Sequence, residues 1–114
     1  MGRLLDEFNA YRERMNRKVL DAANKPIQRL YNLDTVTYQD GALPARTKEM
    51  LGLAASMVLR CDDCIKYHIL KCRELGVKND EFFDIFSVAA TVGGTVVVPH
   101  LRRAVEFLED AGKS

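Results

Sequence analysis

Apolar residues recur every three or four positions through most of this sequence, and that period restricts the fold more than any other feature. The first run contains Leu4, Phe8, Tyr11, Met15, Val19 and Ala22. This spacing places the six side chains along one face of an amphipathic helix. The other faces are strongly charged, so we predict a long N-terminal helix over residues 1–24. Its apolar seam could pack on the core of its own chain or on a neighbouring subunit.

Prolines and glycines divide residues 25–114, the predicted core, into shorter helices. Proline is tolerated in the first turn of a helix, and glycine is frequent just beyond the last turn. The predicted helices run from Ile27, after Pro26, to before the turn Gln39-Asp40-Gly41, from Pro44 to about Arg60, and from about Asp62 to Gly76.

Two further helices complete the prediction. Asn79 or Asp80 caps the fifth, Gly93-Gly94 ends it, and a sixth follows from about Thr95. The predicted inward side chains are Phe82, Ile85, Phe86 and Ala89 in the fifth helix and Leu101, Ala104, Val105 and Leu108 in the sixth. The run Val96-Val97-Val98 could instead form a short strand, because β-branched residues favour one, but the sequence offers no second strand to pair with it.

Length and composition favour a single compact all-α domain of about six helices. The chain has 114 residues, of which 47% are hydrophobic, enough for one core and too few for two. A net charge of +1 supplies no strong positive field for nucleic acid or an anionic membrane. No apolar run approaches the roughly 20 residues of a membrane span, and the N-terminus lacks the pattern of a signal peptide. We expect a soluble, cytoplasmic protein without nucleic-acid or membrane partners.

The segment from Cys61 to His68 reads C-x-x-C-x-x-x-H and carries the most chemical information. On a helix, both cysteines and His68 share one stripe with apolar residues, so we expect a buried thiol pair that points inward or into a cleft. Two cysteines at a helix start can close a disulfide with little backbone movement, and the free amides of the first turn favour a thiolate. His68 lies one turn beyond Cys64, within reach of its proton, as covalent and redox catalysis requires.

Glu49 adds a carboxylate to this cluster. One stripe of the preceding helix would hold Glu49, Leu53, Ser56, Met57 and Arg60 and lead to Cys61. A carboxylate on this mostly apolar face could orient His68 or exchange protons with it. Alternatively, Glu49 could interact with the helix N-terminus or pair with Arg46.

The cysteine count of three, without an export signal, argues against a structural disulfide framework and for redox chemistry or metal binding. We predict that Cys72 is a core residue, because it continues an apolar stripe, and we assign His100 no role. A zinc site would use Cys61, Cys64 and His68, with Cys72, His100 or Glu49 as the fourth ligand. Structural zinc sites usually draw their ligands from two separated pairs, and a second pair is missing. We therefore predict neither a metal nor a cofactor.

The spacing of Glu49 from Cys61-x-x-Cys64-x-x-x-His68 resembles the active-site signature of alkyl hydroperoxidase D type proteins in the carboxymuconolactone decarboxylase superfamily. The flanking segments Leu43-Pro44-x-x-Thr47-Lys48-Glu49, Leu75-Gly76 and Gly93-Gly94 agree, so the similarity covers about residues 25–110. The resemblance implies an all-helical fold that assembles into trimers or hexamers, and a thiol peroxidase activity.

The resemblance also implies roles for single residues. Cys64, activated by His68 and Glu49 through a water-mediated relay, would attack the peroxide. The resulting sulfenic acid would condense with Cys61 to a disulfide, which an external dithiol, a lipoyl group or a thioredoxin-like protein, would reduce. Better studied peroxidase members carry a second histidine between the cysteines, where this chain has Asp62-Asp63. Carboxylates at these positions should disfavour a thiolate.

Two other function classes compete with a peroxidase. A lyase of the decarboxylase branch would need acid and base groups but has no use for a dithiol, so the C-x-x-C pair argues against it. A non-enzymatic helical module could instead bind zinc or sense oxidation through the disulfide. The three hypotheses differ in what they demand of Cys61 and Cys64.

Overall fold

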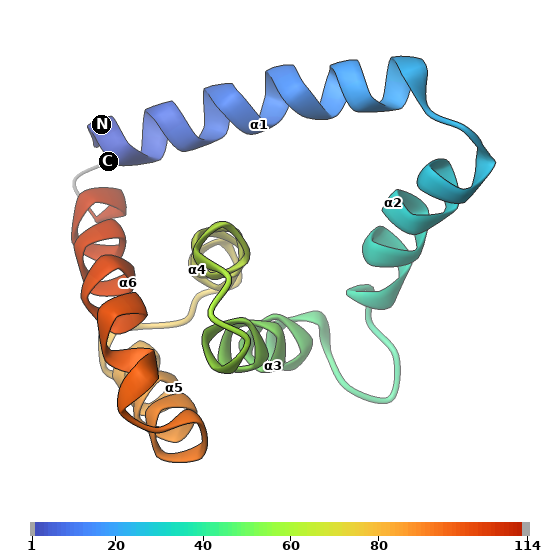
Figure 1. Cartoon of the computed structure of the whole chain (residues 1–114). Helices are drawn as coiled ribbons and strands as arrows, with labels where there is room; N and C mark the ends of the chain where they lie inside the picture. Colours follow the sequence, from blue (N-terminus) through green and yellow to red (C-terminus); the bar gives the residue numbers. More distant parts are fainter. Residues whose placement is uncertain (1, 113–114) are drawn as a thin grey trace.

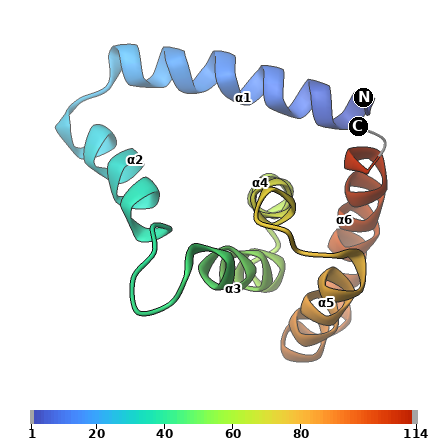
Figure 2. The ribbon, with the colours of Figure 1, turned by 180° about the vertical axis from the view of Figure 1, so that it is seen from behind.

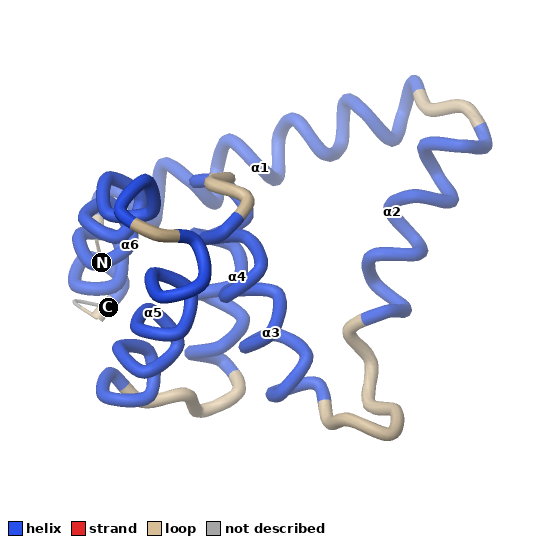
Figure 3. The backbone as a smooth tube through the Cα atoms, turned by 60° about the horizontal axis from the view of Figure 1, so that its bottom comes forward, coloured by secondary structure: helices blue, strands red, loops and turns tan. Residues whose placement is uncertain are grey.

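The computed structural model describes residues 2–112 as helices joined by short loops (Figure 1). The elements are α1 (Arg3–Ala22), α2 (Lys25–Thr37), α3 (Ala45–Val58), α4 (Asp62–Glu74), α5 (Asn79–Gly93), the short 3₁₀ helix η1 (Thr95–Val97) and α6 (Val98–Ala111). The all-α prediction is therefore confirmed. The alternative of a strand at residues 96–98 is wrong, because these residues belong to η1 and α6, and no strand occurs between residues 2 and 112 (Figure 3).

Three helix starts differ from the predicted ones by one or two residues. The side chain of Asn24 accepts a hydrogen bond of 3.1 Å from the Ile27 amide and caps α2. Pro44 is the N-cap of α3 rather than a first-turn residue, and its carbonyl accepts a hydrogen bond of 3.1 Å from the Lys48 amide. Lys78, not Asn79 or Asp80, is the N-cap of α5.

Helices α3 to α6 form the core, with α3 packed on both α4 and α5, and α4 packed on α6 (Figure 2). The largest fully buried side chains are Leu53, Met57, Ile65, Ile69, Cys72, Phe82, Phe86, Val97 and Phe107. The predicted inner face of α5 is confirmed. In α6, Ala104 and Leu108 are buried as predicted, but Phe107 is also buried although the predicted stripe omits it. Phe107 fills the space between α6 and the start of α1, where its ring meets that of Phe8 at 5.5 Å.

Beyond Phe8, α1 leaves the core, and together with α2 it forms an arch that both ribbon views show apart from α3 to α6 (Figure 1). We call this part, residues 9–37, the arm. Tyr11 in the predicted seam is 55% exposed, and α2 contains no buried residue. The radius of gyration is 14.6 Å, against about 13 Å for a compact domain of this length. The arm thus presents apolar surface that its own chain does not cover.

The turn between α3 and α4 places the C-x-x-C segment at the edge of the core. Arg60 adopts a left-handed conformation, with φ of 60°, and lies outside the helix with its side chain exposed. The predicted α3 stripe therefore ends at Met57 and does not include Arg60. Cys61 follows as the N-cap of α4, and Gly76, with φ of 86°, reverses the chain after α4.

No helix in the described part of the chain combines the length and the apolarity that crossing a membrane requires.

Candidate functional site

Cys61 and Cys64 form a disulfide at the start of α4, with their Cα atoms 5.3 Å apart. The Sγ atom of Cys61 accepts a hydrogen bond of 3.3 Å from the Cys64 amide, so this sulfur occupies the N-cap position of the helix. Cys61 is half-buried and Cys64 is exposed. The expectation of a buried pair is therefore wrong for the single chain. The stripe of α4 turns inward only from Ile65, because the first turn projects beyond the edge of α3.

His68 and Glu49 form a buried pair directly behind these cysteines. Nδ1 of His68 lies 2.7 Å from Oε1 of Glu49, and the side chains are 9% and 6% exposed. The alternative in which Glu49 pairs with Arg46 is wrong, because Arg46 donates instead to Glu81 at 2.7 Å. The predicted juxtaposition of Glu49 and His68 is thus present in the structure.

Tyr38, at the end of α2, is a member of this site that the sequence did not reveal. Its hydroxyl lies 3.4 Å from Nε2 of His68. Burial, followed by the charge of Glu49, raises the pKa of Tyr38, so the phenol remains a donor at neutral pH. With Nδ1–H donating to Glu49, Nε2 accepts from Tyr38, and the imidazole is held from both sides. No local pattern around Tyr38 indicates this contact, which spans 30 residues.

Gly52 of α3 leaves the space in which this pair meets. A Cβ atom at position 52 would lie 2.7 Å from Cε1 of His68 and 2.7 Å from the Tyr38 hydroxyl. Real Cβ atoms do not approach other atoms so closely, so a side chain here would displace the ring or the phenol. The glycine is therefore required by the close approach of α3 to the imidazole.

A cavity of about 210 Å³ opens beside the disulfide and is lined by both Cys64 and His68. A second cavity, of about 490 Å³, lies between α1 and α2 and shares Arg12, Asp34 and Tyr67 with the first. The guanidinium of Arg12 stacks on the ring of Tyr67, 4.3 Å from its centre. The two cavities therefore adjoin each other at these three residues.

The remaining predicted candidates divide into a core residue and a surface contact. Cys72 is fully buried, and burial raises its pKa to about 12, which confirms the prediction that it is a core residue. His100, to which the sequence assigned no role, binds Asp62 between the two cysteines: its Nδ1 lies 2.8 Å from Oδ1. Nε of Arg103 donates to the other carboxylate oxygen at 2.9 Å. Asp62 is therefore fixed to α6 by two side chains.

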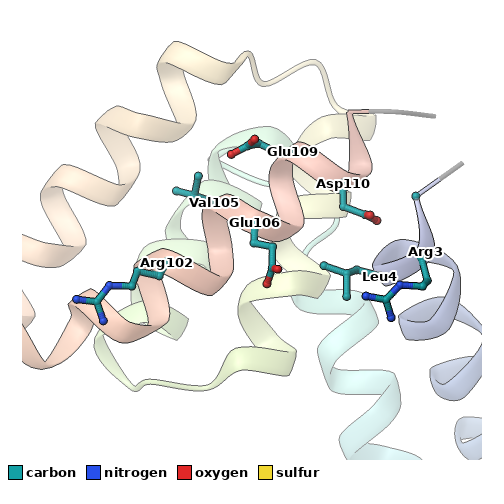
Figure 4. A pocket seen from close by; sticks show the side chains of 8 residues that line it. Arg3, Leu4, Arg102, Val105, Glu106, Glu109 and Asp110 are labelled. Carbon is teal, nitrogen blue, oxygen red and sulfur yellow. The ribbon is translucent and has the colours of Figure 1, made fainter.

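A further cavity, of about 520 Å³, lies elsewhere and carries different chemistry. It is formed between the start of α1 and the outer face of α6, and its lining includes Arg3, Arg102 and Glu106 but neither Cys nor His (Figure 4). Asp110 points into this region, and its carboxylate accepts from the Leu5 amide at 2.8 Å, which satisfies a free donor of the first turn of α1. This cavity thus lies at the contact between α1 and α6, and no cysteine or histidine lines it.

In the described range, residues 2–112, no three side chains of His, Cys, Asp or Glu are placed so that they could hold a metal ion. The ring nitrogens of His68 instead contact Glu49 and Tyr38.

The fold and the Glu49, Cys61, Cys64 and His68 arrangement define a class of small helical proteins with a disulfide-forming cysteine pair beside a buried histidine and glutamate. The model of the carboxymuconolactone decarboxylase family matches residues 27–108, and the chain belongs to this family. The match covers every residue of the cluster, and it excludes all of α1.

Solved structures share the whole architecture, including the arm. The protein TM1620 of Thermotoga maritima superposes with a TM-score of 0.91 at 46% identity, over 94% of each chain. A second structure of TM1620, for which a role in an antioxidative response has been suggested, gives a TM-score of 0.90 at 45% identity, over 94% of this chain and 91% of that one. A carboxymuconolactone decarboxylase family protein of Legionella pneumophila, lpg0406, has the same fold, with a TM-score of 0.83 at 21% identity over 93% of this chain and 95% of its own.

Among the curated relatives, the Uncharacterized protein 4 in cox locus of Paracoccus denitrificans is 31% identical over 78 residues, which are 68% of this chain and 70% of that protein. Its name assigns no activity. The comparisons thus establish the family and the fold.

Proposed function

We propose that this protein is a thiol-dependent peroxidase that reduces hydroperoxides through the dithiol of Cys61 and Cys64. The observation that carries the proposal is the shared cavity: Cys64 and His68 line the same space, and Glu49 holds the far side of the imidazole at 2.7 Å. A nucleophilic thiol, a base and a group that orients the base are the elements of an activated nucleophile. The antioxidative role suggested for TM1620 supports the same conclusion.

The reaction begins with the reduced protein. The Cys64 thiolate attacks the terminal oxygen of the hydroperoxide, an S–O bond forms as the O–O bond breaks, and the alcohol leaves with a proton from the imidazolium of His68. Glu49 stabilises that imidazolium. Cys61 then attacks the sulfenic sulfur, water leaves, and the disulfide forms. The disulfide in this structure corresponds to that product.

A dithiol reductant closes the cycle, and we propose a lipoyl group or a thioredoxin-like protein in this role. The exposure of Cys64 supports this, because thiol–disulfide exchange needs access to a sulfur. The C-x-x-C pair would return to the dithiol form in the reducing cytoplasm, where we place the protein. Apart from the peroxide and the external dithiol, the proposed cycle uses only groups of the chain, and we propose no bound cofactor.

We also propose that the working form is a homo-oligomer, a trimer or a hexamer. Large apolar side chains of the arm are exposed without a partner in their own chain, namely Ile27, Leu30, Leu33 and Val36. Exposed apolar faces of this extent mark interaction surfaces. Light scattering during gel filtration should give three or six chains, and Leu30→Glu with Leu33→Glu should reduce that number. A monomeric wild type would reject this part of the proposal.

The test of the activity is a free-thiol count by mass spectrometry before and after one equivalent of hydroperoxide, on metal-analysed protein. Wild type should lose two thiols and form the disulfide, Cys61→Ser should stop at a sulfenic acid on Cys64, and Cys64→Ser should consume no peroxide. Cys72 serves as an internal control, because its pKa of about 12 keeps it unreactive.

The same experiment separates the competing functions. If both thiols stay unmodified and zinc is found in the purified protein, the protein is a zinc-stabilised module and the catalytic hypothesis is rejected. Turnover of a lactone acid that survives both cysteine substitutions would identify a lyase. Oxidation that stops after a single turnover, with every dithiol tested as reductant, would leave a redox sensor.

A further inference from the structure

A cluster on the other side of the cysteines, outside the Glu49 and His68 pair, has no part in the peroxide reaction. Asp62 follows Cys61 directly in the chain, and its carboxylate is bound on one oxygen by His100 and on the other by Arg103. Both partners come from α6, and the contacts span 38 and 41 residues. Because both carboxylate oxygens of Asp62 bind side chains of another helix, this is a tertiary contact and not a local helix cap.

The charge of Asp62 disfavours a thiolate at Cys61, and the contacts with His100 and Arg103 counteract this effect. Asp62 follows the N-cap residue Cys61 directly in the chain, and a negative charge so near disfavours a thiolate at Cys61. Burial alone would raise the pKa of Asp62, but the hydrogen bond from His100 and the charge of Arg103 outweigh it and lower that pKa. Asp62 thus remains ionised, and Arg103 neutralises its charge.

The sulfurs of Cys61 and Cys64 differ in their accessibility to an external thiol. Cys64 is exposed, whereas Cys61 is half-buried and accepts a hydrogen bond from the Cys64 amide. An external thiolate therefore reaches Cys64 first, and Cys61 is the sulfur that must leave. A leaving thiolate departs faster when its surroundings stabilise negative charge, as the amides of a helix N-terminus do.

We propose that Asp62, His100 and Arg103 form a positioning cluster that anchors the start of α4 to α6 and cancels the carboxylate charge, so that Cys61 leaves as a thiolate when a dithiol reduces the disulfide. In this step the dithiol sulfur bonds to Cys64 as the bond between Cys64 and Cys61 breaks. The second dithiol sulfur then attacks the mixed disulfide, forms the oxidised reductant and releases Cys64 as a thiolate. Two electrons pass from the dithiol to the protein. The proposal rests on the redox cycle of the proposed function, but only on its reductive half.

The test compares two substitutions that break the same ion pair but change the charge in opposite directions. Arg103→Gln leaves the Asp62 carboxylate unbalanced, and Asp62→Asn leaves the guanidinium unbalanced. Each oxidised variant is equilibrated with dithiothreitol redox buffers, and its rate of reduction by dithiothreitol is measured at one pH. Arg103→Gln should shift the equilibrium about threefold to tenfold toward the disulfide and slow its reduction by a similar factor, as expected for a unit charge in partly aqueous surroundings.

Asp62→Asn should produce the opposite shift, toward the dithiol, and the double variant should return near the wild-type value. Arg103→Lys should behave like the wild type. The matched control is Arg102→Gln, which removes the same charge from the neighbouring position of α6, where the side chain lines the cavity at the start of α1 instead. It should leave the equilibrium unchanged within about a factor of two, because that charge lies farther away and is screened.

The opposite signs are decisive. A cluster that only anchors the helix would shift both variants in the same direction, because both lose the same contact, and that result would overturn the proposal. Equal shifts for Arg103→Gln and Arg102→Gln would overturn it as well. If Arg103→Gln fails to fold, Asp62→Asn still tests the proposal, because a shift of that variant toward the disulfide would overturn it. Peroxide consumption is measured separately. If the wild type consumes no peroxide but the two variants shift in opposite directions, the proposed function is rejected and the role of this cluster is supported.

Discussion

Two histidine–carboxylate pairs flank the disulfide of Cys61 and Cys64, one on each side of the first turn of α4. The hydrogen-bond distances are almost equal, 2.7 Å for His68 with Glu49 and 2.8 Å for His100 with Asp62. Their exposure differs: the first pair is 9% and 6% exposed, and the second is 16% and 34% exposed. The same two residue types therefore meet in surroundings of different polarity.

Because of this difference in exposure, we propose different roles for the two pairs. Tyr38 holds His68 of the inner pair, which lines the cavity that Cys64 shares, so the proton transfer that we propose there would be shielded from solvent. The outer pair includes Arg103 and acts on the cysteines through charge, which water partly screens. A short hydrogen bond between histidine and carboxylate is thus not by itself a sign of catalysis. Burial and access to the reacting sulfur decide.

The strongest contrast should appear in the rate of peroxide reduction. His68→Gln removes the base that lines the cavity and should slow peroxide-driven disulfide formation about 100-fold or more, the usual contribution of a general acid or base. His100→Gln should slow it less than tenfold. Both rates are measured by quenched-flow thiol labelling of the reduced protein. Equal losses in the two variants would show that the pairs do not divide the work as described.

The pairs should also differ in what they contribute to stability. Glu49→Ala leaves His68 buried beside an unfilled space, and we expect a loss of about 3 kcal/mol in the free energy of unfolding, typical of a broken buried pair. Asp62→Ala should cost about 0.5 kcal/mol, as for a partly exposed pair. Urea unfolding of the oxidised variants at one protein concentration tests this, because an oligomer adds a concentration-dependent term. Similar losses would contradict the contrast in burial.

The inner pair could be predicted from the sequence because both members lie on regular stripes. Glu49 shares the inner face of α3 with Leu53, and His68 shares that of α4 with Ile65, so two adjacent helices had to bring them together. The six helices followed for the same reason, since proline, glycine and apolar period act locally. Only the function of these residues rests on the family.

The outer pair and Tyr38 could not be predicted, because each contact joins elements 30 or more residues apart and depends on how whole helices pack. The exposure of the cysteines was predicted wrongly for a related reason. A helical stripe gives the direction of a side chain, but how far the neighbouring helix extends decides whether anything covers it. α3 ends at Val58, and the first turn of α4 projects beyond it.

The space around the inner pair offers a smaller test of the same contrast. Gly52→Ala places a Cβ atom 2.7 Å from the ring of His68, which Glu49 prevents from moving away. We expect a loss of about 1–3 kcal/mol in stability, the cost of overpacking, and a roughly tenfold slower reaction with peroxide. Gly41→Ala is the control, because its nearest contact is the flexible end of Lys48 at 3.2 Å. A Gly52→Ala variant with the properties of Gly41→Ala would mean that the imidazole has more room than the structure indicates.

The smallest effect concerns the acid limb of stability, where the outer pair should become visible on its own. Because the pKa of Asp62 is lowered in the folded protein, its contribution is fully present above the unfolded value of about 3.9 and is lost as the pH falls through the folded value. The stability difference between wild type and Asp62→Asn should therefore be on the order of 0.5 kcal/mol at pH 6 and shrink below about pH 4. Asp63→Asn, a change to the adjacent carboxylate that contacts neither His100 nor Arg103, should show no such loss. A difference that stays constant from pH 6 to pH 3 in urea unfolding would mean that Asp62 contributes by shape and not by charge.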